Sequence, residues 1–230
     1  MRHRGHPTIE RLTLGPIQNP VRAFLCGIGA LLAVVGGVFL WLEGAGDPAR
    51  QVALVLFALS LVGLLTVSAL YHGWRWTRPE AERLMQRVDH SMIYVLIAGT
   101  QTPVAFVVLE GWMRVAILAA TWSIATVGVL QKAFLPKVRK RYSVALQIGQ
   151  GWLAALCIAP LSERLPAEAM NLLVAGGLVY TLGAIAYVTR RPRLWPRIFS
   201  YHELFHVCVV CGGALHYSLA LLYLAPFGVH

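Results

Sequence analysis

Charged side chains are scarce in this sequence of 230 residues: they make up 13% of it, whereas about 25% is usual in soluble domains. Hydrophobic residues make up 57%, and the mean hydropathy is +0.63. A chain with so few charges lacks the polar surface that a water-soluble domain of this size needs. The composition therefore argues against a soluble protein and predicts a single integral membrane domain.

Disulfides, signal-peptide features and strand patterns are also missing. All four cysteines (Cys26, Cys157, Cys208 and Cys211) lie in apolar stretches, which argues against a disulfide framework. The N-terminus, MRHRGHPTIERLTLGP, is polar and basic, so we expect no cleavable signal peptide. The apolar runs are long and do not alternate in polarity, which argues against strands.

What the sequence does have is seven apolar segments, each near the length of about 20 residues that a membrane-spanning helix needs. We therefore predict an all-α integral membrane protein, a bundle of seven transmembrane helices. A cytoplasmic tail at 1–20 and a tail at 226–230 are expected to flank the membrane domain at 21–225. The spans are predicted at 21–42, 52–71, 88–109, 115–134, 142–160, 169–188 and 199–225.

The basic residues predict the orientation. If the N-terminus is cytoplasmic, 17 of the 20 basic residues fall on the inner side, and only Arg50, Arg114 and Arg164 fall outside. The positive-inside rule therefore predicts a cytoplasmic N-terminus and an outer C-terminus. It also accounts for the net charge of +10 without nucleic acid. The inner set is Arg2, Arg4, Arg11, Arg22, Arg75, Arg78, Arg83, Arg87, Lys132, Lys137, Arg139, Lys140, Arg141, Arg190, Arg191, Arg193 and Arg197.

Several polar side chains should share one depth in this bundle. The second span ends inside with SALYH, which carries Ser68 and His72. The third begins inside with Asp89, and the seventh begins inside with His202 and His206. Buried polar groups in a membrane are costly unless something compensates them, so this coincidence indicates a site.

The spacing favours a metal ion at that site. His202 and His206 are four residues apart, which places both imidazoles on one helical face about 6 Å apart along the axis. Together with His72 they form the three-histidine ligand set of a catalytic zinc, with one position left open. Asp89 would bind the metal's water or orient a ligand. Nitrogen ligands favour zinc over magnesium or calcium, while iron, nickel and cobalt remain alternatives. Hydrogen bonding between helices is the alternative without a metal.

Three further polar residues in the spans are expected outside the ligand set. His216 lies ten residues beyond His206, about 15 Å along the helix, and is expected to pack or to line a cavity. His90 points away from Asp89's face and is at best a supporting residue. Glu203 projects off the ligand face, and we expect it to form a salt link with a loop arginine.

Three motifs carry a family resemblance. SALYH, DHSMIYVLIAGTQTP and HELFHVCVVCGGALHY resemble the hemolysin III family, the bacterial branch of the progestin and adipoQ receptor group that includes adiponectin receptors. The resemblance implies a seven-helix bundle with its N-terminus inside and a zinc ion held by His72, His202 and His206. Ser68 and Asp89 match the family's accessory serine and aspartate. Gln101 departs from the aromatic residue common in relatives.

The wider superfamily includes alkaline ceramidases, so the resemblance implies a zinc-dependent hydrolase of a lipid amide or ester. Asp89 would be the general base, and Ser68 would donate a hydrogen bond to the oxyanion. Membrane lipids with acyl chains are the expected partners, and the bacterial inner (plasma) membrane is the expected location. Two alternatives remain: a non-enzymatic, zinc-stabilised receptor or lipid-homeostasis protein, and a pore-forming cytolysin.

Overall fold

The computed structural model describes residues 13–15, 17–135, 139–195 and 198–228. Of the basic residues counted above, Arg2, Arg4, Arg11, Lys137 and Arg197 lie outside the described residues, as do parts of both predicted tails. In the described part of the chain the only strand-like pairings are two isolated bridges, Leu14 with Ile17 and Trp195 with Phe199. The prediction of an all-α protein is confirmed.

Seven helical segments of the described chain are long and apolar enough to cross a membrane, which confirms the predicted bundle. The fifth of these is built from three consecutive pieces, α5, η1 and α6. The elements are α1 (Pro20–Glu43), α2 (Pro48–Gly73), α3 (Pro79–Val108), α4 (Gly111–Phe134), α5 (Lys140–Gly151), η1 (Trp152–Cys157), α6 (Ile158–Arg164), α7 (Ala167–Thr189), α8 (Tyr201–Leu219) and η2 (Ala220–Leu224).

Local sequence explains where the helices that build the site begin. Asp47 caps α2 by accepting hydrogen bonds from the backbone N–H groups of Ala49 and Arg50, each at 3.1 Å. Ser200 and Glu203 form a capping box at the start of α8, in which the Ser200 N–H donates to Glu203 Oε2 at 2.8 Å. These contacts satisfy N–H groups that no intrahelical carbonyl can reach.

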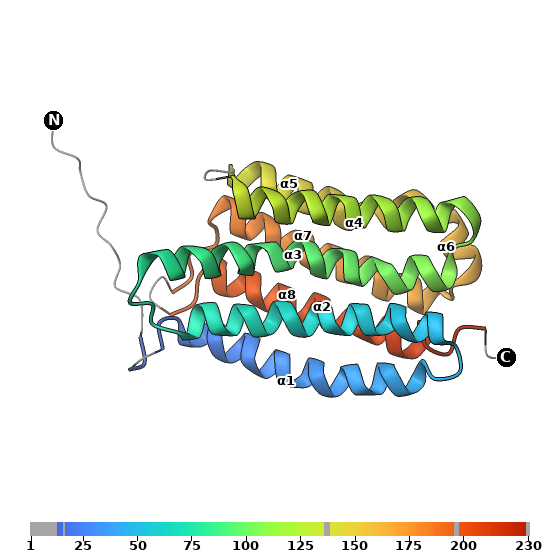
Figure 1. The fold of residues 1–230 in the computed structure, drawn as a ribbon, viewed down its shortest axis with the longest axis horizontal. Helices are drawn as coiled ribbons and strands as arrows, with labels where there is room; N and C mark the ends of the chain where they lie inside the picture. The colour runs from blue at the N-terminus through green and yellow to red at the C-terminus, as the bar shows by residue number, and fades with distance from the viewer. Residues whose placement is uncertain (1–12, 16, 136–138, 196–197, 229–230) are drawn as a thin grey trace.

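The helices run up and down through the bundle in succession (Figure 1). The start of α1, the end of α2 and the starts of α3 and α8 therefore lie at one end of the bundle. The described basic residues of the predicted inner set gather at this same end, whereas Arg50, Arg114 and Arg164 lie at the other. The charge segregation is a property of the fold, and its assignment to the cytoplasm stays a prediction.

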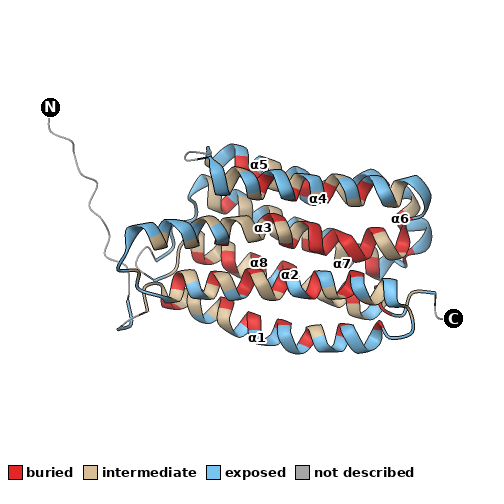
Figure 2. Cartoon of the chain, viewed as in Figure 1, coloured by how far each residue is buried: buried red, intermediate tan, exposed pale blue. Residues whose placement is uncertain are grey.

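Helix α3 is central to the core. In its apolar stretch 56% of the residues are buried, against 17% in α7, and the buried surface concentrates on α3 and its neighbours (Figure 2). Large apolar side chains such as Leu31, Trp112 and Leu156 are exposed instead. Exposed apolar side chains of this size suit a surface that faces lipid.

Some helices extend beyond the predicted spans or change their type within them. Helix α3 begins at Pro79, whereas the apolar pattern placed the third span at 88–109. Its first two turns are polar, with Glu80 and Glu82 favourably placed near the helix N-terminus, and an apolar window cannot detect them. The predicted fifth span, 142–160, changes from α-helix to a 3-10 helix at Trp152. The predicted seventh span, 199–225, ends as the π-helix η2.

Candidate metal centre

Three histidines converge at the end of the bundle where α8 begins. His72 lies in the last turn of α2, and His202 and His206 lie in the first turns of α8. One ligand atom from each of the three imidazoles lies within 4.8 Å of the others. The structure therefore brings together the three residues that the sequence singled out as metal ligands, although they are up to 134 positions apart in the chain.

The rings are arranged around a common point. His202 and His206 lie side by side with centroids 5.1 Å apart and an interplanar angle of 17°. The His72 ring meets both edge-on, at 5.3 Å and 4.8 Å. Nitrogen ligands of a tetrahedral zinc are about 3.4 Å apart, because each Zn–N bond is about 2.1 Å long. The ligand atoms of the trio lie within 4.8 Å of one another, so the imidazoles would have to approach one another to bind one zinc ion.

The surroundings of His206 leave one nitrogen for a metal ion. Its Nδ1 lies 3.3 Å from the Sγ atom of Cys26 on α1. Its Nε2 is buried and has no hydrogen-bond partner among the described residues. The second nitrogen of a metal-binding imidazole usually donates to a carboxylate, a carbonyl or water, and here the Cys26 sulfur takes that place. With Nε2 left for an ion, the donor set fits zinc.

Ser68 and Asp89 line a small cavity together with the histidines of α8. Both are buried, and they reach the same cavity from α2 and α3. The cavity measures about 20 Å³, which suffices for one water molecule, since this requires about 10–15 Å³. Cys26, Leu64, Leu65, Ser68, Asp89, His90, Ile93, Tyr187, His202, Phe205, His206 and Val209 line it.

An ion pair connects α1 to the helix that carries two of the histidines. Arg22 Nη2 lies 2.6 Å from Glu203 Oε1, and the two side chains are 3% and 10% exposed. Glu203 was expected to pair with a loop arginine, but Arg22 lies in the first turn of α1. Because Glu203 also caps α8 at Ser200, one carboxylate fixes both the start of α8 and its position against α1.

The remaining polar residues of the spans lie as follows. His90 lines the small cavity, and its Nε2 is 3.4 Å from the Tyr187 hydroxyl, while the Tyr187 ring packs against His202 at 5.1 Å. These are supporting contacts, as expected for His90. His216 is outside the trio and lines a second, larger cavity.

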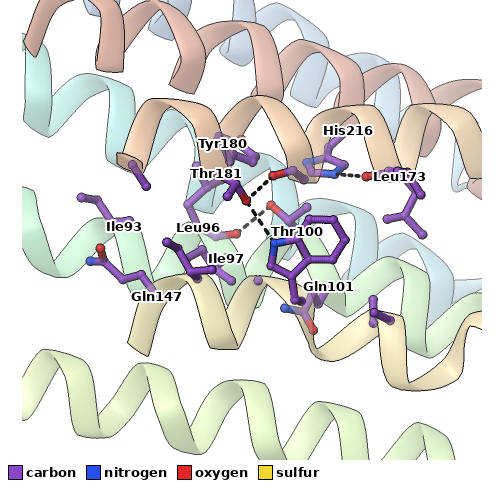
Figure 3. Close-up of a pocket in the computed structure, with 18 of the residues that line it drawn as sticks. Ile93, Leu96, Ile97, Thr100, Gln101, Gln147, Leu173, Tyr180, Thr181 and His216 are labelled. Carbon is purple, nitrogen blue, oxygen red and sulfur yellow. Dashed lines mark hydrogen bonds between the residues drawn. The ribbon is translucent and has the colours of Figure 1, made fainter. Parts of the chain in front are cut away.

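This second cavity measures about 130 Å³ and has mostly apolar walls, most of them from α3, α5, η1, α7 and α8, with single residues from α2 and α6 (Figure 3). Four residues line both cavities: Leu64, Ile93, Phe205 and Val209. These side chains lie where the large chamber and the histidine site adjoin. The sequence offered a cavity-lining role for His216 as one alternative, but the other walls could not be predicted because they come from seven elements.

Comparison with known proteins places this architecture in a family. The model of the haemolysin-III-related family matches residues 16 to 217. The chain belongs to the haemolysin-III-related family. Membership confirms the resemblance drawn from the three motifs, and together with the seven apolar helices it makes the chain a multi-pass membrane protein.

Individual relatives of this family cover nearly the whole chain. "Hemolysin-3" of Bacillus cereus is 32% identical over 220 residues, which are 95% of this chain and 97% of the relative. The "Hemolysin-3 homolog" of Bacillus subtilis (strain 168) is 33% identical over 208 residues, 90% of this chain and 94% of the relative. "Heptahelical transmembrane protein ADIPOR2" of Oryza sativa subsp. japonica is 30% identical over 192 residues, 76% and 82% of the two chains.

One member of the site escaped the sequence analysis of this haemolysin-III-related chain. Cys26 contacts His206, but in the sequence it is only one of four cysteines in apolar stretches, with no motif that marks it. Its depth was a usable signal: it lies in the second turn of α1, and α1 begins at the same end of the bundle as α8.

Proposed function

We propose that this protein is a metal-dependent hydrolase of a lipid amide or ester, with zinc held by His72, His202 and His206. The observation that supports it best is the meeting of three imidazoles, an aspartate and a serine beside an apolar chamber. A three-histidine set leaves a fourth position for water or substrate, as catalytic rather than structural zinc sites do.

Each residue of the site would have its own role in the hydrolysis. The three imidazoles hold the ion, and Cys26 fixes the orientation of His206. Zinc, when bound there, supplies Lewis acidity that polarises a carbonyl group and lowers the pKa of a water molecule towards about 7. The apolar walls of the site limit the access of bulk water, which strengthens every electrostatic interaction inside.

Asp89 and Ser68 would carry the proton chemistry. Asp89 accepts the proton of the attacking water as general base. Ser68, which lines the same small cavity, would donate a hydrogen bond to the oxyanion, and the protonated Asp89 would return its proton to the leaving amine or alcohol. The two side chains come from neighbouring helices, α2 and α3, so their separation is fixed by helix packing.

The lipid would reach the site through the apolar chamber. Part of its acyl chain occupies the cavity of about 130 Å³, and its amide or ester group lies at the small cavity next to it. Membrane lipids are therefore the partners that we propose. The plasma membrane of a bacterial cell is the proposed location.

Turnover of defined lipids tests the proposal. The purified protein is supplied with ceramides and other acyl amides, and the released fatty acid is measured. We expect release by the wild type, loss of release in Asp89→Asn, and unchanged release in Glu110→Gln, a carboxylate in the connection between α3 and α4. Equal release by all three proteins, or release that is independent of metal, would contradict the proposal.

A structural metal site is the second candidate. The observation that favours it is that the trio joins α2 to α8, two helices that are distant in the chain. A metal ion there would stabilise the bundle without turnover, as in a receptor or lipid-homeostasis protein. His72→Ala would then lower the thermal stability, and no lipid would be hydrolysed by the wild type.

Membrane lysis is the third candidate, and it rests on the name "Hemolysin-3" of the Bacillus cereus relative. Conductance of the purified protein in bilayers of defined composition tests it. Discrete conductance steps at low protein concentration would favour a pore. Silent bilayers that contain folded protein would contradict it.

A further inference from the structure

His216 lines the large cavity and has a buried ring nitrogen without a hydrogen-bond partner among the described residues. Its Nε2 lies 3.3 Å from the backbone carbonyl of Leu173 on α7 and therefore acts as the donor. The neutral ring then has an acceptor at Nδ1, which is buried and has no hydrogen-bond partner among the described residues. The residue is 6% exposed and lines the cavity.

Tyr180 on α7 supplies a second such group beside it. Its hydroxyl is buried without a hydrogen-bond partner in the described part of the chain, and Tyr180 lines the same cavity. The rings of Tyr180 and His216 are stacked, with centroids 5.5 Å apart (Figure 3). A hydroxyl donor and an imidazole acceptor therefore belong to two stacked rings that line a mostly apolar chamber.

Two glycines hold these rings in place. A Cβ atom at Gly176 would lie 2.6 Å from His216 Nε2, and one at Gly212 would lie 3.0 Å from the Tyr180 ring. The absence of both side chains lets each ring pack directly on the facing helix. A close fit of this kind fixes the two polar groups as a built feature of the interface between α7 and α8.

We propose that Tyr180 and His216 form a polar subsite for a hydroxyl group on the acyl chain of the bound lipid. This inference rests on the proposed function, in which the chain occupies the cavity. A hydroxyl group is the substituent that accepts a hydrogen bond from the phenol and also donates one to the imidazole. The chemical class that fits is a single-chain lipid with an alcohol partway along an apolar chain.

The position of the subsite along the chain follows from α8. Phe205, Val209 and His216 line the cavity from this helix, and the first two also line the histidine site. His206 and His216 are ten residues apart in one continuous helix, about 15 Å of rise. A lipid whose head group lies at the histidine trio therefore reaches His216 near the middle of its chain.

A binding comparison tests the subsite without any need for turnover. The protein is placed in phospholipid nanodiscs and titrated with stearic acid, and with hydroxystearic acid that carries its hydroxyl in the middle of the chain. We expect the wild type to bind the hydroxylated acid about tenfold more tightly, since two buried groups gain partners. The preference should disappear in Tyr180→Phe and in His216→Gln, which keeps a donor for the Leu173 carbonyl.

Tyr217→Phe is the matched control. It removes a hydroxyl from α8 that donates to the Gly36 carbonyl at 3.2 Å, away from the cavity, and should keep the full preference. Equal affinity of the wild type for the two acids would overturn the subsite. So would a preference that survives in Tyr180→Phe, or a failure of the wild type to bind either acid.

The outcome is separate from that of the proposed function. Asp89→Asn should lose hydrolysis and keep the tenfold preference, because Asp89 does not line the large cavity. If the wild type hydrolyses no lipid but shows the preference, the subsite stands and the hydrolase proposal fails. If it hydrolyses lipid amides and shows no preference, the reverse holds.

Discussion

Two buried polar clusters inside this bundle have different relations to their surroundings. The glutamine cluster is formed by Tyr94, Gln101, Thr121 and Gln150. The side-chain Nε2 of Gln150 donates to the backbone carbonyls of Tyr94 and Thr121 at 3.1 Å each, and the Gln101 side chain donates to the backbone carbonyl of Gln150. In the histidine site, formed by Cys26, Ser68, His72, Asp89, His202 and His206, three imidazoles instead face a common point.

The difference separates two reasons for placing polar groups in a membrane. The glutamine cluster joins α3, α4 and α5 through hydrogen bonds to backbone carbonyls, although the side-chain oxygens of Gln101 and Gln150 have no hydrogen-bond partner among the described residues. The histidine site differs because it gathers one ligand atom from each of three imidazoles within 4.8 Å, which the glutamine cluster does not. A shared cation accounts for the second arrangement and is not needed for the first.

Removal of the metal should give the largest effect and sharpen this contrast. A chelator should lower the free energy of unfolding by about 4 kcal/mol if the free metal was about 1,000 times its Kd. Thermal unfolding with and without chelator measures the change. The chelator should lower the free energy of unfolding of the glutamine-cluster variant Gln150→Leu by as much as that of the wild type. It should not change the stability of His206→Ala. A chelator effect that persists in His206→Ala would contradict the assignment.

Loss of the buried ion pair beside the histidine site should cause the second largest loss of stability. Arg22→Ala leaves the Glu203 carboxylate buried without its cation and should lower the stability by about 3 kcal/mol. Arg83→Ala is the control, because its pair with Glu80 is exposed and should contribute less than about 1 kcal/mol. Equal losses in chemical unfolding of the two variants would show that the Arg22 pair does not position α8.

The contact between Cys26 and His206 predicts a smaller change, confined to metal affinity. Cys26→Ala should weaken zinc binding about tenfold, since the partner that orients the imidazole is lost. Competition with a zinc chelator of known affinity measures it. Cys157→Ala, another buried cysteine, should bind zinc as the wild type does. Matching affinities in both variants would remove Cys26 from the site.

The glutamine cluster itself should give a still smaller loss. Gln150→Leu removes hydrogen bonds to two backbone carbonyls and should cost about 1 kcal/mol of stability, in line with interhelical hydrogen bonds in membranes. Thermal unfolding measures the loss, and the metal content should not change. A loss of zinc in Gln150→Leu would break the comparison between the two clusters.

A pair at the opposite end of the bundle should show the smallest effect. Arg164 NH1 lies 2.6 Å from Glu110 Oε1 and holds the pKa of that carboxyl below its usual range. A lowered pKa stabilises the folded state above the ordinary value of 4.5, and the stabilisation is lost as the pH falls towards the lowered value. In the wild type the melting temperature should therefore fall slightly as the pH falls below the ordinary value, and in Glu110→Gln this fall should be smaller. An equal fall in the two proteins would contradict the pairing.

The bundle and the histidine trio could be predicted from the sequence, because both depend only on how deep each residue lies in the membrane. Long apolar segments define the spans, and successive antiparallel helices bring the end of one span and the start of the next to the same side. His72, His202 and His206 could therefore be placed at one level without knowledge of the packing.

Contacts that depend on helix rotation could not be predicted in this way. Cys26 is a small residue in an apolar stretch, and only the packing of α1 turns it towards His206. The partner of Glu203 was placed in a loop, because an arginine buried in a span, as Arg22 is, is not expected from composition. The early start of α3 was missed because polar helical turns beyond the apolar core carry no hydropathy signal.

Metal analysis of purified protein tests the central claim, that imidazoles from α2 and α8 hold one metal ion. Zinc per chain is measured by elemental analysis for the wild type, His72→Ala, His206→Ala and Gln150→Leu. We predict about one equivalent in the wild type and in Gln150→Leu, and almost none in either histidine variant. Folded wild-type protein without any metal, or histidine variants that keep a full equivalent, would contradict the account.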